Sequence, residues 1–269
     1  MSAAACLVCG AAGGEPSGPL LVRCASCGFT WTAAESAAPD ELYDAGYYED
    51  GGYDGYFQPG ARRFEAGLRL DWLGGFGSPA SLVEAGAAGG FFVEAARARG
   101  IEAQGVEVAE AAVRYAVDEL GVPVERSTFE DAAFDRTFDA VCAFHVLEHV
   151  EDPRAFAARA HAVLAPGGLL ALEVPNIASV AAQRMGSAWP GLQPEYHRWH
   201  FDPDSLPRLV EAAGFTVLHV DTTVFRFYLP PRFRRRQGRH LLRADLRHLR
   251  SARLVHPRRA DLLRLVARR

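Results

Sequence analysis

The stretch from residue 81 to residue 91, Ser-Leu-Val-Glu-Ala-Gly-Ala-Ala-Gly-Gly-Phe, decides the fold of this chain. A short run with strand character leads directly into clustered small residues and then into a helical pattern. A strand that passes through glycines into a helix lets a ligand approach the backbone closely. A second acid, Glu107, follows Glu84 at the end of the next strand pattern. A carboxylate there can bind both ribose hydroxyls of a nucleoside, so the stretch predicts a nucleoside site.

Strand and helix patterns alternate around this stretch. We expect strands at residues 81–85, 103–108, 122–126, 138–144, 169–174, 215–221 and 223–229. We expect helices at 61–75, 90–99, 109–120, 153–164 and 203–213. Such alternation is typical of a parallel sheet with helices on both faces, closed here by an antiparallel hairpin. The predicted fold class is therefore α/β, a Rossmann-like seven-stranded sheet.

Four of the five cysteines form two Cys-x-x-Cys pairs, each followed by glycine: Cys6, Cys9, Cys24 and Cys27. The two intervening residues let backbone amides point at the thiolates, and the glycine permits the turn. Disulfides or buried free thiols are the alternatives, and disulfides are disfavoured in a cytosolic chain. The spacing predicts a closed, structural Zn²⁺ site in a small zinc-knuckle module. Cys142 lies in an apolar strand pattern and is expected in the core.

Composition excludes some classes of protein. No apolar run reaches the roughly 18 residues that cross a bilayer, and the first residues lack the features of a signal peptide. We therefore expect a cytoplasmic protein. All 29 basic residues are arginine, so chemistry that uses a lysine base or a lysine Schiff base is excluded.

Charge is distributed unevenly along the chain. Residues 232–269 hold 14 arginines and two acids, whereas the rest of the chain is strongly acidic. Leucines and arginines alternate at helical spacing in this segment, which predicts a basic helical C-terminal tail. Three roles stay open for it: packing on the body or on a second subunit in a homodimer, attraction to an anionic membrane surface, and binding of nucleic acid.

From residue 82 to residue 217 the chain resembles the class I S-adenosylmethionine-dependent methyltransferases. The glycine turn resembles their Glu/Asp-x-Gly-x-Gly-x-Gly motif, with Ala88 in place of the middle glycine, where it crowds the methionine end of the site. Further similar segments are 105–108, 129–131, 138–153, 163–168 and 173–176. The resemblance implies S-adenosylmethionine as cofactor and the following cofactor-binding residues: Glu84, Gly86, Ala88, Gly90, Glu107, Val108, Phe129, Glu130, Phe144 and His145.

These features divide the chain into four predicted parts. Residues 1–33 form the zinc-binding module, and residues 61–231 form the methyltransferase domain. Between them, residues 34–60 form a linker with an aromatic segment, which either covers the edge of the core or closes over the ligands as a lid. Residues 232–269 form the arginine-rich helical tail.

Histidines are the candidate catalytic groups. Methyl transfer needs alignment and an unprotonated nucleophile, and an alcohol or phenol acceptor usually needs a base for which histidine is suited. His197 and His200 lie in the loop after the fifth strand, where substrate loops occur in this fold, and His149 lies in the loop after the fourth strand. We predict these three as the catalytic candidates; for His149, capping and loop packing are the alternative.

The segment from His145 to His149, His-Val-Leu-Glu-His, also matches a metalloprotease zinc signature, but that signature requires a helix and this segment overlaps a strand end. Some small-RNA and polyprenyl-phenol O-methyltransferases carry Glu-x-x-Glu-His here and bind a divalent ion. The resemblance implies that His145, Glu148, His149 and His200 could imitate that site.

Three functions are weighed. The first is methylation of a small molecule, sugar or glycan, with O-methylation favoured and C- or N-methylation open. The second is methylation of RNA, against which the acidic catalytic body argues. The third is a cofactor-impaired binding module, suggested by Ala88. A dinucleotide-dependent enzyme is disfavoured because residues 86–90 do not give Gly-x-Gly-x-x-Gly.

Overall fold

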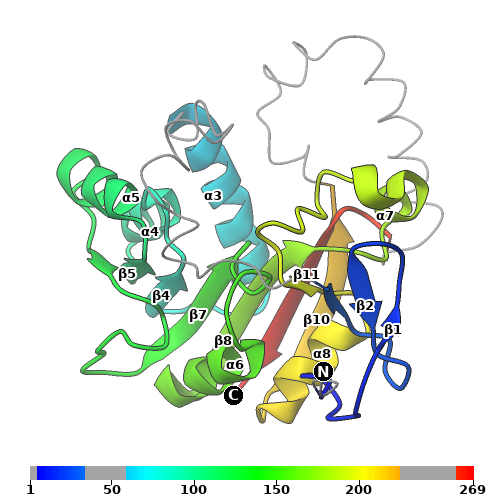
Figure 1. The fold of residues 1–269 in the computed structure, drawn as a ribbon. Helices are drawn as coiled ribbons and strands as arrows, with labels where there is room; N and C mark the ends of the chain where they lie inside the picture. Colours follow the sequence, from blue (N-terminus) through cyan, green and yellow to red (C-terminus); the bar gives the residue numbers. More distant parts are fainter. Residues whose placement is uncertain (1–4, 34–58, 225–258) are drawn as a thin grey trace.

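The computed structural model describes residues 5–33, 59–224 and 259–269. Across these residues a seven-stranded sheet runs in the order β10-β11-β8-β7-β4-β5-β6 (Figure 1). The strands are β4 (Ser81–Ala85), β5 (Glu102–Glu107), β6 (Val124–Arg126), β7 (Phe138–Phe144), β8 (Leu164–Pro175), β10 (Thr216–Thr223) and β11 (Leu262–Arg268). Strands β6, β5, β4, β7 and β8 are parallel, and β11 is antiparallel to both of its neighbours. The predicted α/β sheet is confirmed.

Helices cover both faces of this sheet. One face carries α3 (Pro59–Gly74) and α4 (Phe91–Ala98), and the other carries α6 (Pro153–Val163) and α8 (Ser205–Ala212). The helix expected at 109–120 is α5 (Glu110–Arg114), which continues as a π-helical turn over Tyr115–Glu119. No helix in the described ranges is long and apolar enough to cross a membrane.

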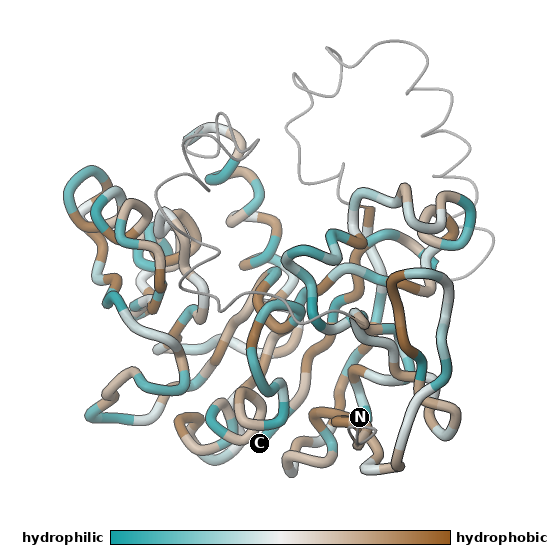
Figure 2. Tube along the Cα trace, in the orientation of Figure 1, coloured by the Kyte–Doolittle hydropathy of each residue, from teal (hydrophilic) through white to brown (hydrophobic). Residues whose placement is uncertain are grey.

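Alternate residues of each central strand enter opposite cores. In β7, Val141 and Ala143 pack beneath α6 and α8, whereas Ala140 and Cys142 pack beneath α3 and α4. Because both faces are buried, residues 140–144 form a continuous apolar run. In Figure 2 the middle of the sheet is drawn largely in the brown colours of hydrophobic residues. The expectation that Cys142 is a core residue is confirmed, since its side chain is fully buried.

The helical tail expected over 232–269 is wrong at its end, because residues 262–268 form β11 inside the sheet. A short apolar run does not distinguish a strand from a helix by periodicity. Leu263 and Leu265 enter one core and Val266 the other, while the Nε of Arg264 donates to Asp221 at 2.8 Å. The methyltransferase sheet therefore extends beyond the predicted boundary at 231. Most of the strand expected at 223–229, the tail up to 258 and the aromatic segment lie outside the described residues.

The N-terminal module does not stand apart from the body. Its strands β1 (Glu15–Pro16), β2 (Leu21–Arg23) and β3 (Thr30–Thr32) form a sheet in the order β1-β2-β3-β9. Strand β9 (Trp199–His200) comes from the loop after β8, which also holds α7 (Val180–Met185) and a 3₁₀ turn at Gly186–Ala188. The module thus shares a sheet with the loop that was predicted to contact the substrate (Figure 1).

Candidate active site

A cavity of about 1020 Å³ lies at the carboxyl ends of the parallel strands. Ligands of open α/β sheets bind at this edge, and the volume is at the upper end of the usual range for small-molecule sites. Most of the predicted cofactor residues line it: Gly86, Ala88, Glu107, Val108, Phe129, Glu130, Phe144 and His145. Glu84 and Gly90 do not appear in its wall.

The glycine turn between β4 and α4 follows a left-handed path. Gly86 and Gly90 have φ angles of 67° and 79°. A Cβ on Gly86 would lie 2.4 Å from Val146 Cγ2, and a Cβ on Gly90 would lie 2.8 Å from Ala116 Cβ. Ala88 has a φ of 45°, in a region that costs an L-residue roughly 1–2 kcal/mol. This explains in physical terms why a glycine suits the position that Ala88 occupies.

Glu107 holds the turn in place. Its Oε2 accepts from the amide of Ala88 at 2.8 Å, and its Oε1 accepts from the amide of Ala109 at 2.9 Å. Burial raises the pKa of Glu107, and these backbone hydrogen bonds oppose that rise. Each oxygen keeps a lone pair beyond its amide, so the carboxylate in the cavity wall can accept from two ribose hydroxyls. The site therefore fits the nucleoside part of S-adenosylmethionine.

Glu84 lies behind the turn. It is buried, and its Oε2 has no hydrogen-bond partner within the described part of the chain. Burial, together with the nearby Glu107 charge, raises the pKa of Glu84 well above its usual range, although Arg69 opposes this. Its direct contact with the cofactor stays a prediction.

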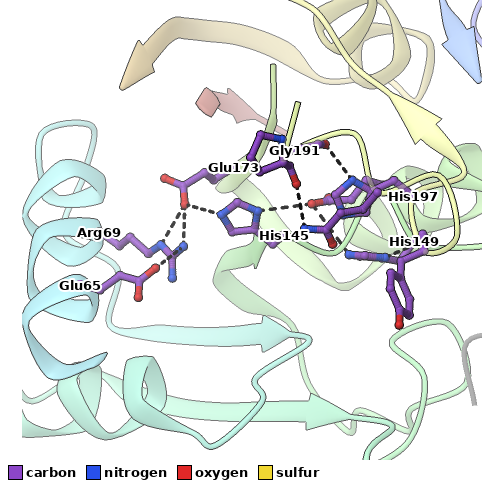
Figure 3. Close-up of polar contacts among 11 residues, drawn as sticks. Glu65, Arg69, His145, His149, Glu173, Gly191 and His197 are labelled. Carbon is purple, nitrogen blue, oxygen red and sulfur yellow. Dashed lines mark hydrogen bonds and ion pairs between the residues drawn. The ribbon is translucent and has the colours of Figure 1, made fainter. Parts of the chain in front are cut away.

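A chain of ion pairs crosses the cavity wall from α3 to the loop after β7 (Figure 3). Arg69 Nη2 lies 2.8 Å from Glu65 and 2.6 Å from Glu173. His145 continues the chain, with Nε2 at 3.5 Å from Glu173 and Nδ1 at 3.4 Å from Glu148. Burial lowers the pKa of His145, but the two carboxylates outweigh it and raise the pKa to about 9. His145 is therefore a cation at neutral pH.

Sequence reasoning missed Arg69 and Glu173. The signal for Glu173 was available, because it is the single charged residue within the apolar run 169–174 and buried acids need a partner. Its side chain is fully buried. Nothing local marks Arg69 among the arginines of α3, since its partner lies on a strand more than a hundred residues away.

Glu148, His149 and His197 bring their ligand atoms within 4.8 Å of one another. The Nδ1–H groups of His149 and His197 donate to the carbonyls of Tyr196 and Gly191, each at 3.1 Å. Because a carbonyl only accepts, these bonds fix the tautomer and leave both Nε2 lone pairs unprotonated. Such backbone support is typical of histidines that bind metals.

The pKa values of His149 and His197 agree with unprotonated Nε2 atoms. Burial lowers the pKa of His149 and lowers that of His197 to about 3, so both rings are neutral. Burial raises the pKa of Glu148, but the cationic His145 outweighs it and the net shift is downward. Apart from its ion pair with His145, Glu148 has no hydrogen-bond partner for its two oxygens among the residues that the structure describes. The carboxylate, which lines the cavity, is therefore charged and poorly satisfied.

The structure does not place His200 at this wall. His200 does not line the cavity, and its Nε2 lies 3.0 Å from Thr32 Oγ1 of the N-terminal module. The assignment of His200 as the base stays a prediction that this geometry does not support, because its hydrogen bond faces β3 rather than the cavity. The predicted metal site consisted of His145, Glu148, His149 and His200. The structure instead brings together ligand atoms of Glu148, His149 and His197, and His145 is a cation beside them.

The four cysteines of the module converge although they come from two separate turns. Their Sγ atoms all lie within 4.8 Å of one another, with Cys6 and Cys27 at 3.5 Å and Cys9 and Cys24 at 3.6 Å. Tetrahedral Zn²⁺ with Zn–S bonds of about 2.3 Å needs S···S edges of about 3.8 Å. Burial and the adjacent thiols raise the pKa of Cys27 to about 12. Burial also acts on Cys24, yet the amides of Cys27 and Ser26 and the adjacent thiols lower the pKa of Cys24 to about 7. The site therefore fits a thiolate-bound zinc ion.

Comparison with known proteins agrees with this geometry. A family model described as a methyltransferase domain matches residues 61–220. The ubiquinone biosynthesis O-methyltransferase of Chromobacterium violaceum is 29% identical over 163 residues, which are 55% of this chain and 70% of that protein. The enzyme of the same name from Methylobacterium nodulans is 35% identical over 155 residues, 53% of this chain and 61% of that protein.

Two solved structures share the fold. A possible histamine N-methyltransferase from Thermotoga maritima superposes with a TM-score of 0.58 at 18% identity, covering 82% of this chain and 97% of that one. The 1,6-didemethyltoxoflavin-N1-methyltransferase of Burkholderia thailandensis, solved with S-adenosylhomocysteine, has a TM-score of 0.57 at 19% identity, covering 91% and 96%.

The sheet order, the glycine turn and the carboxylate that ends β5 define a class I S-adenosylmethionine-dependent methyltransferase. More specifically, because the family model covers more than half of its residues, the chain belongs to the methyltransferase domain family.

Proposed function

We propose that this enzyme transfers a methyl group to a hydroxyl of a small molecule, and that the hydroxyl binds at the wall formed by Glu148, His149 and His197. One observation carries the proposal: a buried carboxylate, whose oxygens make no hydrogen bond in the described residues beyond the ion pair with His145, lies beside two neutral imidazoles in the cavity. A hydroxyl is a donor that satisfies acceptors of this kind. The names of the O-methyltransferase relatives support the same chemistry.

The chain divides the work between two walls of the cavity. S-adenosylmethionine supplies a methyl group on a sulfonium that is already activated for displacement. Glu107 and the turn from Gly86 to Gly90 hold the nucleoside, and the wall of Glu148, His149 and His197 orients the acceptor hydroxyl and takes its proton. His145 compensates the charge of Glu148, which keeps this carboxylate ionised inside the protein.

The bases at this wall are weak, and this bears on how the hydroxyl is activated. A His197 pKa of about 3 leaves the ring neutral but makes it a poor proton acceptor. Two neutral histidines and a carboxylate are also a common ligand set for divalent cations. A cation held by Glu148, His149 and His197 would lower the pKa of a hydroxyl that binds to it.

We also propose that Cys6, Cys9, Cys24 and Cys27 bind one structural zinc ion. Their convergence supports this, because four thiols within a few ångströms repel one another once ionised unless a cation lies between them. We expect one zinc per chain by elemental analysis, and none after Cys24→Ser. Full-length protein that carries no zinc when produced in zinc-supplemented medium would contradict this assignment.

A methyl-transfer assay tests the proposed function. Tritiated S-adenosylmethionine is incubated with the enzyme and a panel of phenols, catechols and sugars, with and without Mg²⁺ or Mn²⁺, and methyl ethers are identified by mass spectrometry. Glu148→Gln is expected to lower kcat by about 100-fold while S-adenosylmethionine binds with unchanged affinity, since loss of an acid–base group typically costs 10²–10⁴. The matched control is Glu195→Gln, at an exposed glutamate of the same loop system. Full activity of Glu148→Gln would refute the proposal.

A further inference from the structure

The wall formed by Glu148, His149 and His197, here called the acceptor wall, is joined to the cysteine module. His197 is followed after one residue by β9, and β9 pairs with β3 of the module through Thr30 with His200 and Trp31 with Trp199. Thr32 lies at the end of β3, only five residues after Cys27, the last cysteine of the module. Its amide donates to the carbonyl of Arg198 at 2.9 Å. Strand β3, which follows the second cysteine turn, thus runs directly along residues 196–200, here called the acceptor loop.

The hydroxyl of Thr32 makes two contacts across this boundary. It donates to the carbonyl of His197 at 2.6 Å, and it lies 3.0 Å from His200 Nε2. Since a hydroxyl has one proton, which goes to the carbonyl, the His200 contact is an N–H donor to Thr32. All three residues are buried. Without this hydroxyl a buried carbonyl and a buried N–H would lose their partner together.

The other side of the same loop is bonded to the backbone of Glu148. The amides of Arg198 and Trp199 both donate to the Glu148 carbonyl, at 2.8 and 3.2 Å. The acceptor loop therefore lies between β3 on one side and the residue that carries the cavity carboxylate on the other. A shift of β3 would move His197 relative to Glu148.

The cysteine turns set the position of β3. The amide of Cys24 donates to the carbonyl of Phe29 at 2.8 Å, and the amide of Gly28 donates to the carbonyl of Cys24 at 2.9 Å. The ring of Phe29 then stacks on Trp199 with centroids 6.0 Å apart and planes at 21°. Cys6 and Cys24 belong to the same buried cluster as Phe29. The cysteine turns therefore contact β9 through packed side chains as well as through the backbone of β3.

The cofactor wall, formed by Glu107 and the glycine turn, shares the buried apolar cluster with the module through residues of β4 and β5, but the described residues show no hydrogen bond or strand pairing between the two. Glu107 and the glycine turn hydrogen-bond to one another, to Val106 and Ala109 and to α4. Among the strands that the structure describes, the module pairs with no strand of the body except β9. A perturbation of the module should therefore reach the acceptor side of the cavity before it reaches the cofactor side.

We propose that the cysteine module positions the acceptor wall of the active site, and that Thr32 is the positioning residue that joins β3 to His197 and His200. Loss of order in the four-cysteine cluster, by metal removal or by thiol oxidation, then disorders the acceptor loop while the cofactor still binds. This inference rests on the proposed role of His197 and Glu148 as the acceptor wall. Its test uses no acceptor, so it can fail or succeed independently of the proposed function.

Hydrogen–deuterium exchange of the full-length chain tests the inference, with S-adenosylhomocysteine affinity as a second readout. Thr32→Val keeps the shape and removes the hydroxyl, and Thr32→Ser restores it. Thr30→Val is the matched control, because Thr30 is a buried threonine of the same strand whose hydroxyl, within the described residues, bonds only to the nearby carbonyl of Gly28 at 3.3 Å. A second arm strips metal from the wild-type protein with a chelator and needs no substitution.

In Thr32→Val we expect the amides of residues 196–200 to exchange about tenfold faster, as the loss of a buried hydrogen-bonded pair implies. Residues 85–90 should keep their protection, and S-adenosylhomocysteine should bind within about twofold of wild type. Thr32→Ser should restore protection, Thr30→Val should leave it unchanged, and chelation should reproduce the effect of Thr32→Val. Equal effects of Thr32→Val and Thr30→Val would overturn the proposal, and so would loosening of residues 85–90 to the same extent as residues 196–200.

Discussion

Two arginines of α3 allow a quantitative test of the ionic chain. Arg69 pairs with Glu173, whose side chain is fully buried, whereas Arg63 pairs with the half-buried Glu94 near the surface. Each arginine places two nitrogens close to its glutamate, so the two pairs differ in solvent exposure and in the additional contact of Arg69 with Glu65. Removing one partner of a buried ion pair costs about 3–5 kcal/mol, and an exposed pair contributes about 0–1 kcal/mol.

Arg69→Met and Arg63→Met keep most of the aliphatic volume and remove the charge. We expect Arg69→Met to lower the free energy of unfolding by about 3 kcal/mol, at the lower end because His145 still faces Glu173. Arg63→Met should cost less than about 1 kcal/mol. In a chain of this size, Arg69→Met should lower Tm by about 6–12 °C, and Arg63→Met should lower it by less than about 4 °C.

Calorimetry and urea titration measure both variants. Adding Glu173→Gln to Arg69→Met should recover part of the loss, because the buried charge that lacks its cation is then gone. If Arg69→Met is no less stable than Arg63→Met, the ionic chain does not stabilise the wall as we argue.

Three further predictions concern the cofactor side and His145. Ala88→Gly should raise the free energy of unfolding by about 0.5–1 kcal/mol, since relief of the left-handed strain exceeds the added chain entropy; a fall measured by urea titration would count against the strain. Glu107→Gln should weaken S-adenosylmethionine binding about 10- to 100-fold in calorimetry, and an unchanged Kd would remove Glu107 from the site. His145, with a pKa raised to about 9, contributes stability that is complete below pH 6.5 and is lost as pH rises through 9. The loss should be on the order of 2 kcal/mol and absent in His145→Gln.

Local patterns predicted much of the fold. The strands at 81–85 and 138–144 and the helix beginning at Pro153 agree with the structure to within a residue or two. These segments combine an apolar run with clear turn or capping signals, which local sequence records directly. The glycine turn and Glu107 could be located for the same reason, because strand, turn and acid follow one another along the chain.

Pairings between distant segments could not be predicted in this way. Strand β11 is an apolar run that is equally compatible with a helix, and only its place between β8 and β10 decides its conformation. The choice between His197 and His200 also depends on a distant segment, since Thr32 engages His200 from the N-terminal module. The ion pair of Arg69 with Glu173 joins an early helix to the fifth strand of the sheet. Such contacts have no local signature.

The most direct test of the account is to identify where the enzyme places a tritiated methyl group. The purified chain is incubated with labelled S-adenosylmethionine and either small metabolites or total RNA, and the wild-type protein is compared with Glu148→Gln. We predict label in a small-molecule methyl ether for the wild type and about 100-fold less for Glu148→Gln. Label in RNA alone, or equal transfer by both proteins, would contradict the account.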